Sequence, residues 1–211
     1  MECEEGCGCN IPEAKAYVRS VGGVDHLFCC SDCADVFQES RLSEAAEVLR
    51  QRAVAGQTVV DLGCGAGYYT QLLRDLVGPR GNIYAVDADP GRLQQAERHL
   101  GCRFGPGSSG WVHFLQFSRP IPSGSADLIL SNNVLCCTRD RSAEVREMFR
   151  MIRPGGFAYV RVNDVRAEGV TSIGDEEWRE LFSGWTNLGE GAAGQVRWKL
   201  LKRPFPNEGF L

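Results

Sequence analysis

The segment Val59-Val60-Asp61-Leu62-Gly63-Cys64-Gly65-Ala66-Gly67 constrains the fold more than any other part of the 211-residue chain. Its β-branched and apolar residues end at a glycine, which predicts a buried strand. Three glycines spaced two apart then allow the backbone to turn sharply and to approach a ligand closely. The apolar residues that follow recur three and four apart up to Val77, which is the period of a helix. The segment predicts a strand, a glycine-rich loop and a helix, and by itself it also fits a plain strand-to-helix connection.

A second short run of apolar and β-branched residues, Asn82–Val86, ends on the acid Asp87. This acid follows the loop by roughly 20 residues in the sequence. That separation is typical of an acid whose carboxylate contacts the ribose of a bound nucleotide. A dinucleotide-binding Rossmann domain is the competing interpretation. Its fingerprint is G-x-G-x-x-G, whereas the glycines here read G-x-G-x-G after Asp61-Leu62, so that interpretation is the weaker one.

The two motifs resemble those of the class I S-adenosylmethionine-dependent methyltransferases, which read Val-Leu-Asp-Leu-Gly-Cys-Gly-x-Gly and, at the second strand, Val-Asp. Two later segments carry the same resemblance: Ile121–Asn132 matches the loop and strand Phe-Pro-Asp-Gly-Ser-Phe-Asp-x-Val-x-Ser, and Ile152–Val160 matches the turn Leu-Arg-Pro-Gly-Gly. The resemblance covers about residues 55–204 and implies S-adenosylmethionine as the cofactor. The residues that it implies for cofactor binding are Asp61, Gly63, Gly65, Gly67, Asp87, Ala88, Ser118, Ser131 and Asn132.

One motif of the family is absent. Many relatives have Gly-Asp-Ala after the third strand, and its acid contacts the adenine amino group. This chain has Phe117-Ser118-Arg119 there, which leaves Gln116, Ser118 or backbone groups for that contact.

The resemblance and the periodicities together predict an α/β fold: a Rossmann-like seven-stranded sheet with a terminal antiparallel hairpin, plus a small N-terminal module. We expect helices at 40–53, 68–77, 90–100, 141–153 and 175–182, and strands at 59–62, 82–86, 111–117, 126–132, 157–160, 185–190 and 195–202.

Cysteines are concentrated at the N-terminus, where six of the ten lie within the first 33 residues. In a reducing compartment such a cluster points to metal binding before disulfides. The stretch Phe28–Phe37 resembles the small TRASH or YHS metal modules, and the resemblance covers about residues 3–40. It implies a zinc-finger-like module with structural Zn²⁺. The candidate ligands are Cys7, Cys9, Cys29, Cys30 and Cys33; which three or four of them bind is left open, and Cys33 with Cys29 or Cys30 is the firmest pair.

We therefore divide the chain into a metal-binding module at 1–40, a connector helix at 41–54 that either covers the cleft or packs as a linker, and a methyltransferase domain at 55–211.

The net charge of −4 and scattered basic residues argue against a nucleic-acid partner. The sequence has no apolar stretch of about 20 residues that could span a bilayer, and its N-terminus is acidic, so we expect a cytoplasmic protein without a membrane partner. The pattern does not indicate an oligomeric state.

The methyl acceptor is the least constrained feature, because methyl transfer requires no fixed pair of catalytic residues. Cys136 and Cys137 follow the predicted central strand and are candidate catalytic thiols at the cleft rim, or they simply pack there. A distant similarity to arsenite methyltransferases, which bind their metalloid through cysteine thiolates, implies a small soft acceptor: a thiol or a metalloid. Two other hypotheses stay open, a metal sensor or carrier built on this fold and a protein methyltransferase whose N-terminal module docks the partner.

Overall fold

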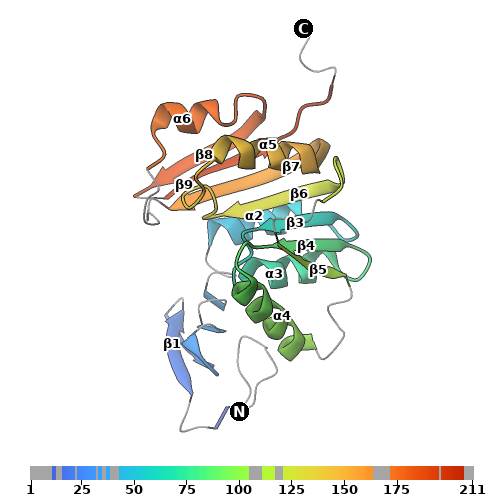
Figure 1. Cartoon of the computed structure of the whole chain (residues 1–211). Helices are drawn as coiled ribbons and strands as arrows, with labels where there is room; N and C mark the ends of the chain where they lie inside the picture. The colour runs from blue at the N-terminus through green and yellow to red at the C-terminus, as the bar shows by residue number, and fades with distance from the viewer. Residues whose placement is uncertain are drawn as a thin grey trace.

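The computed structural model describes residues 11–12, 16–21, 23–31, 33–34, 37–38, 43–104, 111–116, 121–163, 172–194 and 196–206. Its main body is a seven-stranded sheet with helices on both faces (Figure 1). The strands of this sheet are β3 (Thr58–Leu62), β4 (Asn82–Val86), β5 (Val112–Leu115), β6 (Ala126–Asn132), β7 (Ile152–Asn163), β8 (Thr186–Ala193) and β9 (Val196–Lys202). The helices are α2 (Glu44–Arg52), α3 (Tyr68–Val77), α4 (Pro90–Phe104), α5 (Arg141–Met151) and α6 (Asp175–Glu180).

The strand order β5-β4-β3-β6-β7-β9-β8 confirms the predicted fold class. The first five strands in this order are parallel, and β9 and β8 form the antiparallel hairpin at one edge. The chain moves outward from β3 to β5 on one side and from β6 to β8 on the other. The order therefore reverses between β3 and β6, and open sheets of this kind bind ligands beside that reversal, at the carboxyl ends of the strands.

Both faces of the sheet are buried, which explains the continuous apolar runs of its central strands. Successive side chains of a strand point to opposite faces: Val59 packs among the side chains of α2, α3 and α4, and Val60 packs among those of α5 and α6. Figure 1 shows α3 and α4 on one face and α5 and α6 on the other.

Helix α2 packs against the sheet as a linker. Its N-terminus is capped by Ser43, whose hydroxyl accepts a hydrogen bond of 3.0 Å from the Ala46 N–H. The same hydroxyl lies 3.1 Å from that of Tyr69, which ties the helix to α3. Leu49 is buried in the same cluster as the central strands. No residue of α2 lines the large cleft described below, so α2 fits the packed linker better than a lid.

The Pro-Gly-Gly turn departs from the prediction, because β7 begins at Ile152 rather than after the turn. Ile152 pairs with Ala126 and Phe157 pairs with Leu128, so the extra residues between them form a bulge. The carboxylate of Asp127 stabilises this region: it accepts hydrogen bonds of 2.6 Å from Arg153 Nε and 2.8 Å from the Thr58 N–H.

Other element ends also differ from the expectations. Helix α4 continues beyond Gly101, its predicted end, to Phe104, while α6 ends at Glu180 instead of residue 182. In the hairpin, β8 extends to Ala193. Within the described part of the chain, no helix combines the length and the apolar character needed to cross a membrane.

The N-terminal segment forms a small antiparallel hairpin of β1 (Tyr17–Val21) and β2 (Val24–Phe28). Phe28 and Phe37 pack edge to face with their ring centroids 5.1 Å apart. They belong to a separate small core with Ile11, Val21, Cys33 and Ala34.

Candidate active site

A cleft of about 970 Å³ lies at the carboxyl ends of β3, β4 and β6, beside the reversal of strand order. Its volume suits a ligand the size of a nucleoside-based cofactor together with a small molecule. The N-terminal hairpin contributes Arg19 to its lining. The residues that line it are Arg19, Gln38, Gly63, Cys64, Gly65, Ala66, Tyr68, Tyr69, Asp87, Ala88, Arg92, Asn132, Asn133, Val134, Cys137, Thr138, Glu144, Arg161 and Asn163.

The glycine loop is held against the end of β4. The backbone N–H groups of Gly63 and Cys64 both donate to the Val86 carbonyl, at 2.7 and 2.9 Å. Gly63 has φ +72°, and a Cβ there would lie 2.3 Å from Val134 Cγ2. Gly67 has φ +86°, and a Cβ there would lie 2.9 Å from the Cβ of Ala96. Gly63 therefore allows the loop to pass Val134, and Gly67 allows α3 to pack closely on α4.

Asp87 lies beside this loop in a fixed orientation. Its Oδ2 accepts a hydrogen bond of 2.9 Å from the Gly65 N–H, and its Oδ1 accepts one of 2.9 Å from the Asp89 N–H. A carboxylate oxygen has two lone pairs, so each oxygen can still accept another hydrogen bond. Asp87 and Ala88 both line the cleft, where the carboxylate can receive two hydroxyl groups of a ligand.

Asp61 and Ser131, both predicted to bind the cofactor, lie inside the sheet instead of on the cleft lining. Thr70 Oγ1 donates a hydrogen bond of 2.5 Å to Asp61 Oδ2, and burial raises the pKa of Asp61 to about 7. Ser131 is fully buried, and its hydroxyl has no hydrogen-bond partner among the described residues. Asp61 is therefore placed to hold α3 below the loop, and Asn132, the residue after Ser131, does line the cleft.

The end of the cleft beyond β6 is polar. Arg161 Nη1 donates a hydrogen bond of 3.1 Å to Asn132 Oδ1, which joins the ends of β6 and β7. Asn133 has φ +59°, a left-handed conformation that asparagine tolerates better than most residues, and its N–H donates to the Arg161 carbonyl at 2.8 Å. We call the lining residues Asn132, Asn133, Cys137, Thr138, Glu144, Arg161 and Asn163 the acceptor end of the cleft.

The two candidate catalytic thiols differ in exposure. Cys136 is 8% exposed, its Sγ lies 3.3 Å from the Asn133 carbonyl, and it does not line the cleft. Burial, together with the neighbouring Cys137, raises the pKa of Cys136 to about 11, so it is a neutral thiol at pH 7. Cys137 is exposed and lines the cleft, with its Sγ 3.8 Å from that of Cys136. Of the two, Cys137 is the thiol that a ligand can reach.

Part of the chain is similar to a known family. Residues 60–160, just under half of the chain, match the family model of a methyltransferase domain. The chain also has the overall fold of a SAM dependent methyltransferase from Aquifex aeolicus, with a TM-score of 0.63 and 20% identity over 81% of this chain and 97% of that one.

The chain is also similar to two proteins named arsenite methyltransferase. One, from Aquipseudomonas alcaligenes, is 34% identical over 119 residues, which cover 54% of this chain and 34% of that protein. The other, from Halobacterium salinarum, is 26% identical over 166 residues, 76% of this chain and 39% of that protein. This chain thus spans well under half the length of both relatives. An arsenic(III) S-adenosylmethionine methyltransferase from Chlamydomonas reinhardtii shares the fold at a TM-score of 0.57 and 20% identity, over 74% of this chain and 66% of that one.

The cleft fits S-adenosylmethionine by its chemistry. Asp87 offers two oriented carboxylate oxygens, and Gly65 leaves open the space that a Cβ would occupy, apart from Arg92 Nη1 at 3.5 Å. When bound, the cofactor supplies an electrophilic methyl group on a positively charged sulfur. The predicted residues that line the cleft and would hold it are Gly63, Gly65, Asp87, Ala88 and Asn132.

Several lining residues of the cleft were not predicted from the sequence. Arg161 and Asn163 are two residues apart at the end of β7, after the apolar run of that strand. Residues two apart in a strand point to the same face, so the sequence could have placed both side chains together beside the end of β6. Glu144 lies in the first turn of α5 and belongs to no motif. Arg19 is distant in sequence and reaches the cleft only through the position of the N-terminal hairpin.

Three of the five predicted metal ligands come together in the N-terminal segment. The Sγ atoms of Cys29, Cys30 and Cys33 all lie within 4.8 Å of one another, with 3.4 Å between Cys29 and Cys33 and 3.8 Å between Cys29 and Cys30. Thiolates bound to one tetrahedral Zn²⁺ at about 2.3 Å would lie about 3.8 Å apart, so these positions fit such an ion. The other two predicted ligands, Cys7 and Cys9, and the predicted cofactor residue Ser118 lie outside the described residues.

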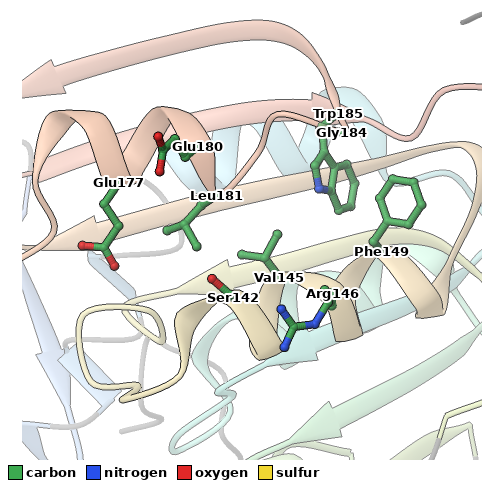
Figure 2. Close-up of a pocket in the computed structure, with 9 residues that line it drawn as sticks. All are labelled: Ser142, Val145, Arg146, Phe149, Glu177, Glu180, Leu181, Gly184 and Trp185. Atoms are coloured by element: carbon green, nitrogen blue, oxygen red, sulfur yellow. The ribbon is translucent and has the colours of Figure 1, made fainter.

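A second, smaller hollow of about 400 Å³ lies between α5 and α6 (Figure 2). Its lining includes the apolar side chains of Val145, Phe149, Leu181 and Trp185. One of its acids, Glu177, accepts a hydrogen bond of 2.8 Å from Arg141. It shares no lining residue with the larger cleft and contains none of the site residues predicted from the sequence, so the larger cleft is the candidate active site.

Proposed function

We propose that the protein transfers a methyl group from S-adenosylmethionine to a small molecule whose acceptor atom is soft, either a thiol sulfur or a trivalent metalloid such as arsenic in arsenite. The observation that carries this proposal is that one cleft contains both the predicted cofactor residue Asp87 and the exposed thiol of Cys137. The similarity to proteins named arsenite methyltransferase supports the same class of acceptor.

In this proposal the residues of the chain bind and orient the reactants and exclude water. Asp87, oriented by the Gly65 N–H, holds the donor at one end of the cleft, and Asn132 belongs to the acceptor end. The Arg161 hydrogen bond to Asn132 holds that side chain in place. Arg19 from the N-terminal hairpin adds a cationic side chain to the lining of the cleft. Holding the two reactants in contact while excluding water is the main contribution that a methyltransferase makes to the rate.

The test is a screen with a methyl-labelled donor. Purified full-length protein is offered arsenite, dithiothreitol and a monothiol, and, as acceptors without a soft atom, glycine and a catechol. We expect label in the methylated product of at least one soft acceptor, and none when Asp87→Ala replaces the wild-type protein. Transfer only to glycine or the catechol, or to no acceptor while the donor binds, would overturn the assignment.

We further propose that residues 1–40 form a module that binds structural Zn²⁺, joined by the connector at 41–54 to a methyltransferase domain at 55–211 in the cytoplasm. The spacing of the Cys29, Cys30 and Cys33 thiols favours this role, with a fourth ligand from Cys7 or Cys9. A metal sensor or carrier predicts readily exchanged metal and no methyl transfer. A protein methyltransferase predicts that deleting residues 1–40 impairs turnover on a partner protein and spares a small peptide.

A further inference from the structure

Glu144 is a carboxylate of the acceptor end that the structure leaves without a partner. It lines the cleft from the first turn of α5 and is partly buried. Its Oε1 is buried and has no hydrogen-bond partner within the described part of the chain. A buried carboxylate oxygen without a hydrogen bond costs free energy, so its presence in a ligand cleft indicates a role toward the ligand.

The neighbouring Glu147 provides a direct comparison on the same helix. It forms a two-point ion pair with Arg150, with oxygen–nitrogen distances of 2.5 and 2.8 Å, and this pair lowers the pKa of Glu147. Burial, with a smaller effect from Glu147, raises the pKa of Glu144. Two acids three residues apart thus have opposite environments. Of the two, only Glu144 lines the cleft, so Glu147 serves as a control on the same helix.

The charged groups that share the cleft with Glu144 come from four other segments. Arg161 on β7 donates to Asn132, and Asp87 follows β4. Arg92 lies on α4, and Arg19 lies on the N-terminal hairpin. No hydrogen bond or ion pair joins any of these groups to Glu144 among the described residues. Glu144 is therefore available to an acceptor bound beside Asn132 and Cys137.

We propose that Glu144 accepts the proton of a thiol acceptor while the acceptor sulfur is methylated. This inference rests on the proposed function and narrows its acceptor to a protic one. A trivalent metalloid attacks through a lone pair and has no proton to lose at the reacting atom, so its methylation would not require Glu144.

The S–H bond of the acceptor breaks, its proton moves to the Glu144 carboxylate, and the sulfur lone pair forms a bond to the methyl carbon. The bond between that carbon and the donor sulfonium breaks, and its electrons return to the donor sulfur. The products are a neutral methyl thioether, the neutral donor thioether and a protonated Glu144, so the positive charge of the sulfonium cancels the negative charge of the carboxylate. Water removes the proton from Glu144 before the next turnover.

The chemistry of a thiol suits this role. A free thiol has a pKa of about 8.5 and is mostly protonated at pH 6.5, so a base increases its rate of attack. Above that pKa the thiolate forms without help. The contribution of Glu144 must therefore fade as the pH rises, whereas damage to the structure of the cleft would reduce the rate at every pH.

The experiment compares wild type, Glu144→Gln and the control Glu147→Gln with dithiothreitol as acceptor and labelled S-adenosylmethionine as donor, from pH 6 to pH 9.5. At pH 6.5 we expect kcat of Glu144→Gln to be lower by roughly 10²-fold or more, the range of general-base catalysis. The deficit should shrink toward pH 9.5. Donor affinity, measured by calorimetry without acceptor, should stay within about twofold of wild type, and Glu147→Gln should match wild type.

Each other outcome has a definite meaning. Equal kcat for wild type and Glu144→Gln at pH 6.5 overturns the role of Glu144, as does a deficit that is constant with pH. Turnover of arsenite without turnover of any thiol by the wild type overturns this inference and leaves the proposed function standing. No turnover of any soft acceptor by a wild type that binds the donor overturns both.

Discussion

The backbone N–H of Gly65 donates a hydrogen bond of 2.9 Å to Oδ2 of Asp87. This contact joins the loop after β3 to the end of β4. It explains why the glycine loop and the acid occur together in the sequence: the acid shapes the loop, and the loop fixes the direction in which the acid presents its remaining lone pairs.

Replacing Asp87 by alanine should therefore weaken binding of S-adenosylmethionine by at least tenfold. A hydrogen bond to a charged group contributes about 1.5–3 kcal/mol, and about 1.4 kcal/mol corresponds to a factor of ten. Calorimetry of the purified protein measures the dissociation constant. Asp75→Ala, which removes an exposed acid of α3, is the matched control and should bind as the wild type does. Unchanged affinity in Asp87→Ala would show that the ribose contact lies elsewhere.

Gly63 allows a second test, based on its close approach to Val134. Gly63→Ala should destabilise the protein by about 1–2 kcal/mol for the left-handed backbone, and by about 1–3 kcal/mol more for the 2.3 Å contact with Val134 Cγ2. Gly124→Ala has a similar φ of +64° and nothing within 4 Å of the added Cβ, so it should show the backbone cost alone. Urea denaturation of both variants measures the difference.

The double variant Gly63→Ala/Val134→Ala isolates the contact. Once Cγ2 is removed, the nearest remaining atom is Val134 Cβ at 3.6 Å, an ordinary contact. The double variant should be more stable than the sum of the two single effects predicts, by about 0.5–3 kcal/mol. Strict additivity would mean that the loop adjusts without contacting Val134.

Asp61 predicts a pH dependence of stability. Its pKa is about 7 in the folded protein because of burial, against an ordinary value of 3.8. Between these values the folded protein keeps a proton that the unfolded chain releases, so the free energy of unfolding falls as the pH rises from about 4 to about 7 and levels off above. The full effect is on the order of 4 kcal/mol at most. Asp61→Asn should flatten the curve measured by urea denaturation without cofactor from pH 5 to pH 8. Equal slopes in the two proteins would contradict the raised pKa.

The sequence predicted the parts of the site that one segment encodes by itself. The loop at 63–67 and Asp87 follow from local glycine spacing and from the end of a strand. A motif gives the types of its residues but not the directions of their side chains. Those directions depend on how side chains alternate between the two faces of each strand. Asp61 lies in β3 between Val60 and Leu62, both of which pack toward α5, so its side chain points toward α3 and Thr70 instead of the cleft.

At the acceptor end, Asn132 and Cys137 were predicted from the end of the central strand. Glu144 in the first turn of α5, and Arg161 and Asn163 at the end of β7, could not be predicted from motifs, because these elements meet only in the folded sheet. They converge because β7 pairs with β6 and the chain enters α5 directly after the loop that contains Cys137. Arg19 joins the same cleft from the N-terminal hairpin, a contact that depends on how the two parts of the chain pack.

The thiol cluster of the N-terminal segment gives the last prediction. Cys33 is buried, with its Sγ 3.4 Å from that of Cys29, so Cys33→Ser should remove a ligand at the centre of the proposed site while changing the side-chain volume little. Elemental analysis of full-length protein purified with zinc present should find about one Zn²⁺ per chain in wild type and in the control Cys137→Ser, and much less in Cys33→Ser. Because a bound structural ion contributes directly to folding, a chelator should lower the Tm of the wild type and leave that of Cys33→Ser nearly unchanged. A wild type without zinc, or with zinc that Cys33→Ser retains in full, would contradict the assignment of these three thiols.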